Sequence, residues 1–247
     1  MNAEENENVT FPATPNVLRM VAGSGTWQVR AYFSSSHLWA AKHFVQLAAE
    51  LENSNGVGSG IDIQHRAYVI NAVLSSVAFL EAAINELCKD VFDRHESYIA
   101  PISEEARVHI SAMWENTEEK KRFEPILKKY QRVLSHCEKD QFNKNEQPYQ
   151  NARLAIELRN GLMHYKPESY GGYQAEFQNF SDQHLLTQQL RSKFIENPLV
   201  LNSGNPYFPD KCLGSPCADW AIRSVKSLTD AFFLELGVKP HYQHAEL

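Results

Sequence analysis

The sequence has 247 residues, of which 43% are hydrophobic, and a formal net charge of −6 at pH 7. A chain of this length and composition can bury a core of its own without disulfide or metal cross-links. The negative charge excludes tight nucleic-acid binding over the whole surface, because such binding needs many lysine and arginine contacts with phosphates. Any nucleic-acid site must therefore be local.

The cysteines and the hydropathy of the chain indicate a cytoplasmic protein. The four cysteines occur in a sequence that does not begin with a secretory leader pattern, so a reducing compartment is the simpler interpretation. No uninterrupted apolar run approaches the length of about 18 residues that a spanning helix needs, so we expect no membrane span.

In chain order, residues 1–25 mix acidic residues, proline and glycine without a sustained period, and predict an irregular N-terminal tail. Residues 26–240 predict a single all-α domain, a helical bundle with long core helices, because the long segments repeat their apolar residues at the helical period. The predicted helices lie within residues 26–53, 65–94, 103–116, 121–139, 147–166, 182–198 and 216–236.

Local signals mark several boundaries of these elements. Ser215 and Pro216 suit the N-cap and first positions of the last helix, and Gly237 follows its end. The run SYGGYQAEF, residues 169–177, has turn residues with aromatic flanks and predicts a short extended excursion.

The stretch ELRNGLMHYKPE, residues 157–168, places three polar side chains near the end of a predicted helix, just before a proline. At about 100° per residue, Asn160 and His164 are surface neighbours on one polar stripe. Arg159 falls on the opposite, apolar arc and is expected to point toward the core.

The segment RNGLMH, residues 159–164, resembles the signature of the HEPN (higher eukaryotes and prokaryotes nucleotide-binding) superfamily. That signature is an arginine, often followed directly by asparagine, with a histidine after four to six further residues. In the superfamily it lies late in a helix of an all-α bundle. The resemblance covers residues from about 27 to 166 plus the last helix.

This resemblance implies a metal-independent endoribonuclease without a cofactor, acting as a toxin or defence effector. It implies that Arg159, Asn160 and His164 form the catalytic site. The expected partners are RNA, a second copy of the chain in a homodimer, and an antitoxin or other regulatory protein.

The residue types suit that chemistry. Attack by the 2′-OH of RNA needs a group that moves protons near neutral pH, and histidine has its ordinary pKa in that range. A guanidinium fork and an amide can hold the phosphate and stabilise its developing charge.

Two other interpretations of the segment stay open. The chain can be a catalytically inactive HEPN-like module that binds a nucleotide, RNA or a protein through the same surface. It can also be a helical scaffold in which His164 is an ordinary solvated histidine at a helix end.

Lys121, Lys128 and Arg132 share a helical stripe and are the candidate RNA-binding residues. Because lysine and arginine are common on helix exteriors, a solvated charged face is the competing interpretation.

A buried arginine needs a partner, and the helix predicted over residues 65–94 offers one. Glu81 lies at the centre of its apolar stripe, so we predict that Glu81 pairs with Arg159 and supports the site.

Cys212 and Cys217 are spaced C-x4-C, which indicates a metal or redox site only if further ligands converge. We therefore expect no metal there. Cys217, at a helix N-terminus, is either an unusually acidic thiol or, as we prefer, a small packed residue.

Overall fold

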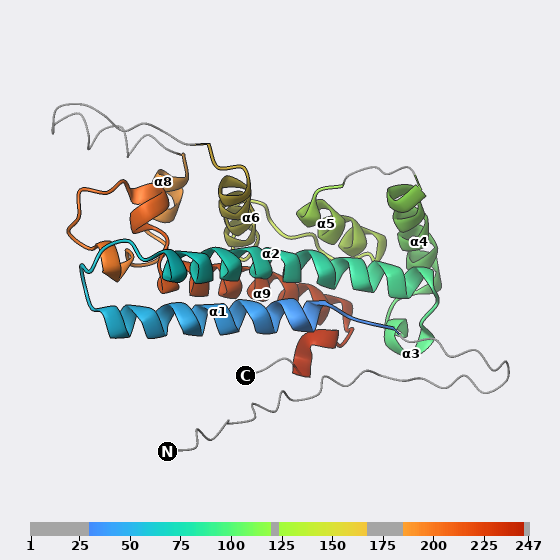
Figure 1. Cartoon of the computed structure of the whole chain (residues 1–247). Helices are drawn as coiled ribbons and strands as arrows, with labels where there is room; N and C mark the ends of the chain where they lie inside the picture. Colours follow the sequence, from blue (N-terminus) through green and yellow to red (C-terminus); the bar gives the residue numbers. More distant parts are fainter. Residues whose placement is uncertain (1–29, 120–123, 167–184, 245–247) are drawn as a thin grey trace, which may run out of the picture. The chain divides into compact units, whose positions relative to one another are not determined.

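Three long helices form the centre of the structure: α1 (Ser34–Asn55), α2 (Ile63–Phe92) and α9 (Ser215–Leu236) (Figure 1). The computed structural model describes residues 30–119, 124–166 and 185–244. The chain divides between Tyr32 and Phe33, and every helix of the described ranges belongs to the unit that begins at Phe33. No strand occurs within the described ranges, and the predicted all-α class is confirmed.

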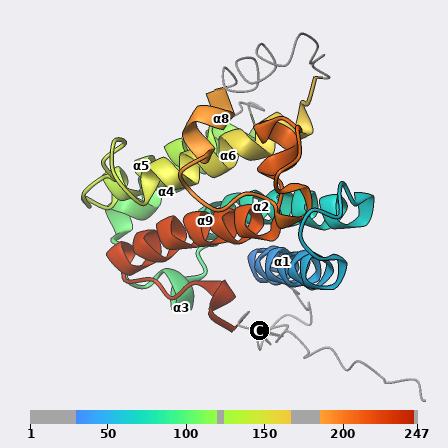
Figure 2. The same ribbon diagram turned by 90° about the vertical axis from the view of Figure 1, so that its left-hand side faces the viewer.

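The remaining helices are arranged around α2. Within the unit, α1 lies on one side of α2, and α4, α5, α6 and α8 lie on the opposite side (Figures 1 and 2). These four helices are α4 (Glu104–Glu119), α5 (Ile126–His136), α6 (Tyr149–Met163) and α8 (Leu185–Leu190). The short elements are α3 (Glu96–Ile99), η1 (Pro198–Val200), η2 (Tyr207–Lys211) and η3 (His241–His244).

α2 is the core helix of the fold. The Asp62 carboxylate caps its N-terminus by accepting the His65 backbone N–H at 2.8 Å. Because α1, α4, α6 and α9 all pack against α2, its buried side chains cover more than a single stripe. They include Val69, Val73, Val77, Phe79, Leu80, Ile84 and Leu87.

Glycines end the two outer helices of the central group. Gly56 follows α1 with φ 79°, and Gly237 follows α9 with φ 69°, in the left-handed region that a glycine adopts without strain. The helices predicted over residues 65–94 and 216–236 correspond to α2 and α9, which the structure places at Ile63–Phe92 and Ser215–Leu236.

Carboxylates from other helices cap α1 and α9. Glu86 on α2 accepts the Ser34 backbone N–H at 2.8 Å and the Ser34 hydroxyl at 2.5 Å. Glu52 on α1 accepts the corresponding groups of Ser215 at 2.6 Å and 2.5 Å. The prediction that Ser215 is the N-cap is wrong: Gly214 occupies that position without a side chain, and Glu52 supplies the acceptor.

The helix predicted over residues 182–198 is shorter than expected, because α8 ends at Leu190.

Asn197 connects the chain after α8 to the segment before α9. Its backbone N–H donates to the Lys211 carbonyl at 2.7 Å, and its side chain donates to the Leu213 carbonyl at 3.0 Å. The predicted tail over residues 1–25 and the predicted excursion over 169–177 lie outside the described residues.

By length and composition, α2 could cross a membrane, since an 18-residue window of it has a mean hydropathy of 1.7. Half of that window is buried inside the structure, and the core helix of a soluble protein passes the same test. The expected cytoplasmic location therefore stays a prediction.

Candidate functional site

The last turns of α6 hold the predicted catalytic residues. Asn160 and His164 are both exposed, and the one-turn spacing makes them neighbours on the helix surface. The His164 backbone N–H still donates to the Asn160 carbonyl at 2.9 Å, so the helical geometry continues to the histidine. The helix therefore presents an amide and an imidazole side by side to solvent.

Gly161 sets how closely this part of α6 approaches its neighbours. A Cβ at residue 161 would lie 2.8 Å from Leu186 Cδ1 and 3.6 Å from Phe208 Cζ. The Tyr165 ring lies 6.3 Å from the Phe208 ring, centre to centre. α8 and η2 therefore pack against the helix end between Asn160 and His164 and hold it in place.

Arg159, which precedes Asn160 on α6, is half-buried. Its Nε is buried and has no hydrogen-bond partner, and no ion pair joins its guanidinium to any residue that the structure describes. A buried polar atom without a protein partner is uncommon and calls for a bound water, an ion or a ligand. Because Arg159 is only half-buried, the expectation that it points toward the core is correct only in part.

The predicted pair between Glu81 and Arg159 is not formed in the described structure. Glu81 is half-buried, and neither an ion pair nor a hydrogen bond joins its carboxylate to a described residue. Glu81 lies at the edge of the buried surface of α2, since Val77 and Ile84 are buried but Ala78 and Asn85 are only half-buried. Both charges keep some contact with water, so neither requires the other as a partner.

The predicted RNA-binding stripe is largely neutralised by one carboxylate. Arg132 Nη1 donates to both oxygens of Glu124, at 2.9 and 3.0 Å, and Lys128 Nζ lies 3.5 Å from the same carboxylate. Lys121 lies outside the described residues. Lys129, one residue beyond Lys128, is buried and donates to Asn85 at 2.8 Å. The described part of the stripe thus offers one net positive charge.

The cysteines are free thiols, and three of them are buried. Burial and the neighbouring Cys212 raise the pKa of Cys217, which rules out an acidic thiol at the start of α9. Burial likewise raises the pKa of Cys88 to about 12. Within the described ranges, no group of three or more potential ligands among His, Cys, Asp and Glu is placed to hold a metal ion.

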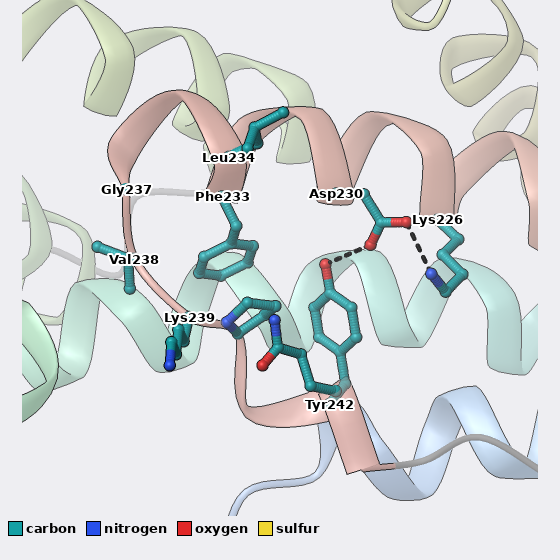
Figure 3. A pocket seen from close by; sticks show the side chains of 10 residues that line it. Lys226, Asp230, Phe233, Leu234, Gly237, Val238, Lys239 and Tyr242 are labelled. Carbon is teal, nitrogen blue, oxygen red and sulfur yellow. Dashed lines mark hydrogen bonds and ion pairs between the residues drawn. The ribbon is translucent and has the colours of Figure 1, made fainter.

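A hollow of about 520 Å³ lies where α9 ends and the C-terminal segment turns back (Figure 3). The Asp230 carboxylate accepts hydrogen bonds from the Tyr242 hydroxyl at 2.9 Å and from Lys226 Nζ at 2.7 Å, so these three polar groups of the hollow satisfy one another. The other walls include Phe233, Val238 and Pro240. None of the predicted catalytic residues lines this hollow.

A second hollow, of about 510 Å³, contains two histidines that no sequence motif singles out. His109 on α4 and His136 at the end of α5 have stacked rings whose centres are 5.4 Å apart. The two residues lie far apart in the sequence, so only the fold brings them together.

Comparisons with known protein families, with characterised proteins and with solved structures found no match to this chain.

Proposed function

We propose that this chain is a HEPN-like, metal-independent endoribonuclease that acts as a toxin or defence effector. The observation that carries the proposal is on α6: an exposed amide and imidazole lie one turn apart, and the same helix turn carries Arg159, whose buried Nε has no hydrogen-bond partner among the described residues. The RNGLMH segment predicts the same residues for a HEPN-like site.

His164 would move the protons of the reaction. A base takes the proton from the ribose 2′-OH, the 2′ oxygen attacks the adjacent phosphorus, and the bond from phosphorus to the 5′ oxygen breaks. The leaving 5′ oxygen takes up a proton, so the products are a 2′,3′-cyclic phosphate and a 5′-OH. An exposed histidine suits this work because its ordinary pKa lies near physiological pH.

Arg159 and Asn160 would bind the phosphate. A guanidinium whose donors are not occupied by carboxylates can give two parallel hydrogen bonds to a phosphate, and the Asn160 amide can add a third. Loss of such donors costs most when the charge on the phosphate oxygens grows in the transition state.

One copy of α6 does not bring these groups together well. Around an ideal helix, Arg159 and His164 are about 140° apart, whereas a substrate phosphate needs both within hydrogen-bond reach. Two copies related by a two-fold axis would place both histidines at one cleft, so we propose a homodimer as the active form.

A second candidate function is RNA or nucleotide binding without cleavage. It is favoured by the surroundings of His164, whose imidazole forms no hydrogen bond with any described residue, so no carboxylate orients its tautomer. A binding module needs the surface but not this orientation.

The test is an RNA-cleavage assay with the purified full chain and EDTA. We expect the wild type to cut bulk RNA, and His164→Ala and Arg159→Ala to lower the rate by about 100-fold or more. The matched control is His43→Ala, which removes a half-buried histidine of α1 that stacks on Trp39 and should leave the rate at pH 7.5 unchanged. Binding by the wild type without any cleavage would instead support the binding module.

A further inference from the structure

α4 and α5 meet through a pair of stacked histidine rings. His109 lies on α4 and His136 is the last residue of α5, and their rings are 5.4 Å apart between centres and only 15° from parallel. The two helices are neighbours at one end of the unit (Figure 1). The histidine pair is therefore part of the contact that holds α5 to α4.

One ring nitrogen of His136 has no hydrogen-bond acceptor nearby for a second N–H. Its Nε2 is buried and has no hydrogen-bond partner in the described part of the chain. A neutral imidazole carries one N–H, and its second nitrogen can stay without a partner at modest cost, whereas an imidazolium has two N–H groups to satisfy. The site is built for the neutral ring.

On balance, the surroundings of His136 also favour the neutral imidazole. Burial lowers its pKa below the ordinary value of 6.5, and Arg132 and His109 lower it further, while Glu124 opposes them. The hollow beside the pair is also lined by Glu105 from α4 and by Glu138 and Lys139 from the chain after α5. Lys139 Nζ in turn lies 3.9 Å from Glu235 on α9.

We propose that the stacked His109 and His136 form a pH-sensitive latch between α4 and α5, closed when both imidazoles are neutral and opened when they are protonated. Two imidazolium rings in this arrangement repel each other, and the positive charge of Arg132 adds to the repulsion on His136. The latch does not depend on the proposed ribonuclease activity, because none of its residues belongs to the α6 site.

The direction of the effect follows from proton binding. Because the pKa of His136 is lower in the folded chain, the open state binds more protons, and stability is lost as pH falls through the ordinary histidine range. α5 also carries Lys128 and Arg132. Mild acid would therefore change how this helix presents its positive charges.

The test is amide hydrogen exchange of the full chain at pH 7.5 and pH 5.5, corrected for the intrinsic effect of pH. We expect protection in α4 and α5 to fall by about threefold or more at pH 5.5 relative to α2 and α9. His136→Phe keeps a flat ring that cannot be protonated, so it should abolish this difference. His43→Phe is the matched control, since His43 stacks on Trp39 of α1, and should leave the difference unchanged.

An equal loss of protection in the wild type and in His136→Phe would overturn the proposal, as would no loss in the wild type. If His136→Phe does not fold, the ring protons of His136 can be titrated by NMR in the wild type. The latch requires a pKa below the ordinary histidine value, and a pKa at or above it would contradict the latch.

Discussion

Glu52 of α1 holds the first residue of α9: its carboxylate accepts the Ser215 backbone N–H at 2.6 Å and the Ser215 hydroxyl at 2.5 Å. The same carboxylate lies 2.7 Å from His65 Nε2 on α2. One side chain, only 8% exposed, thus joins the three central helices near one end. Its negative charge also suits the N-terminus of α9.

Glu52→Gln should destabilise the fold by about 1–3 kcal/mol, because it removes a charged acceptor from two buried donors. Chemical denaturation at pH 7 measures the free energy of unfolding. Glu50→Gln is the matched control: Glu50 is exposed and accepts a hydrogen bond from Gln46 on the same helix, so its substitution should change stability little.

The Glu52 carboxylate should also make the stability of the fold depend on pH. Burial alone would raise the pKa of Glu52, but hydrogen bonds from His65 and Ser215 outweigh it and leave the pKa below its ordinary value of 4.5. The stabilisation is therefore complete above the ordinary carboxyl range and is lost as pH falls through the folded pKa. Melting temperatures between pH 6 and pH 3 should fall less steeply for Glu52→Gln than for the wild type; parallel curves would show that Glu52 does not set acid stability.

Gly214→Ala should cost about 1–3 kcal/mol of stability, because the new Cβ would lie 2.8 Å from the Cα of Asn197 and the backbone there cannot rotate away. Asn197 is fixed by its bonds to Lys211 and Leu213. Gly204→Ala is the control, since a Cβ there meets no atom within 4 Å. Equal melting temperatures for the two variants would contradict this account of the α9 start.

Glu81→Gln should change the free energy of unfolding by no more than about 0.5 kcal/mol, because Glu81 is half-buried and pairs with no described residue. Denaturant unfolding of the variant measures this directly. A loss of about 2 kcal/mol or more would mean that Glu81 and Arg159 do interact in solution, as the sequence pattern predicts.

The sequence predicts the helices better than their contacts. The helical period locates α2 and α9 to within about two residues, because apolar spacing and glycine stops are local properties. The N-cap of α9 is missed because its acceptor, Glu52, is distant in sequence. The prediction for Glu81 fails for the same reason: a helical wheel gives the apolar face of α2 but not how α5 and α6 cross it.

In the candidate site, too, the sequence predicts features of a single helix but not the contacts between helices. The exposed positions of Asn160 and His164 follow from the polar stripe of α6, which is visible in sequence. The close approach of Leu186 and Phe208 to Gly161 depends on α8 and η2, which follow α6 in the chain but leave no motif. The stacking of His109 on His136 could not be predicted from either helix alone.

End-group analysis distinguishes attack by the 2′-OH from other ways of cutting RNA. An RNA oligonucleotide is incubated with the full chain in EDTA, beside the same oligonucleotide with 2′-deoxy sugars. We expect that only the ribose form is cut, that the products carry 2′,3′-cyclic phosphate and 5′-OH ends, and that His164→Ala leaves both substrates intact. Cleavage of the deoxy form, products with 3′-OH and 5′-phosphate ends, or full activity in His164→Ala would contradict the assignment of a 2′-OH-dependent ribonuclease site to α6.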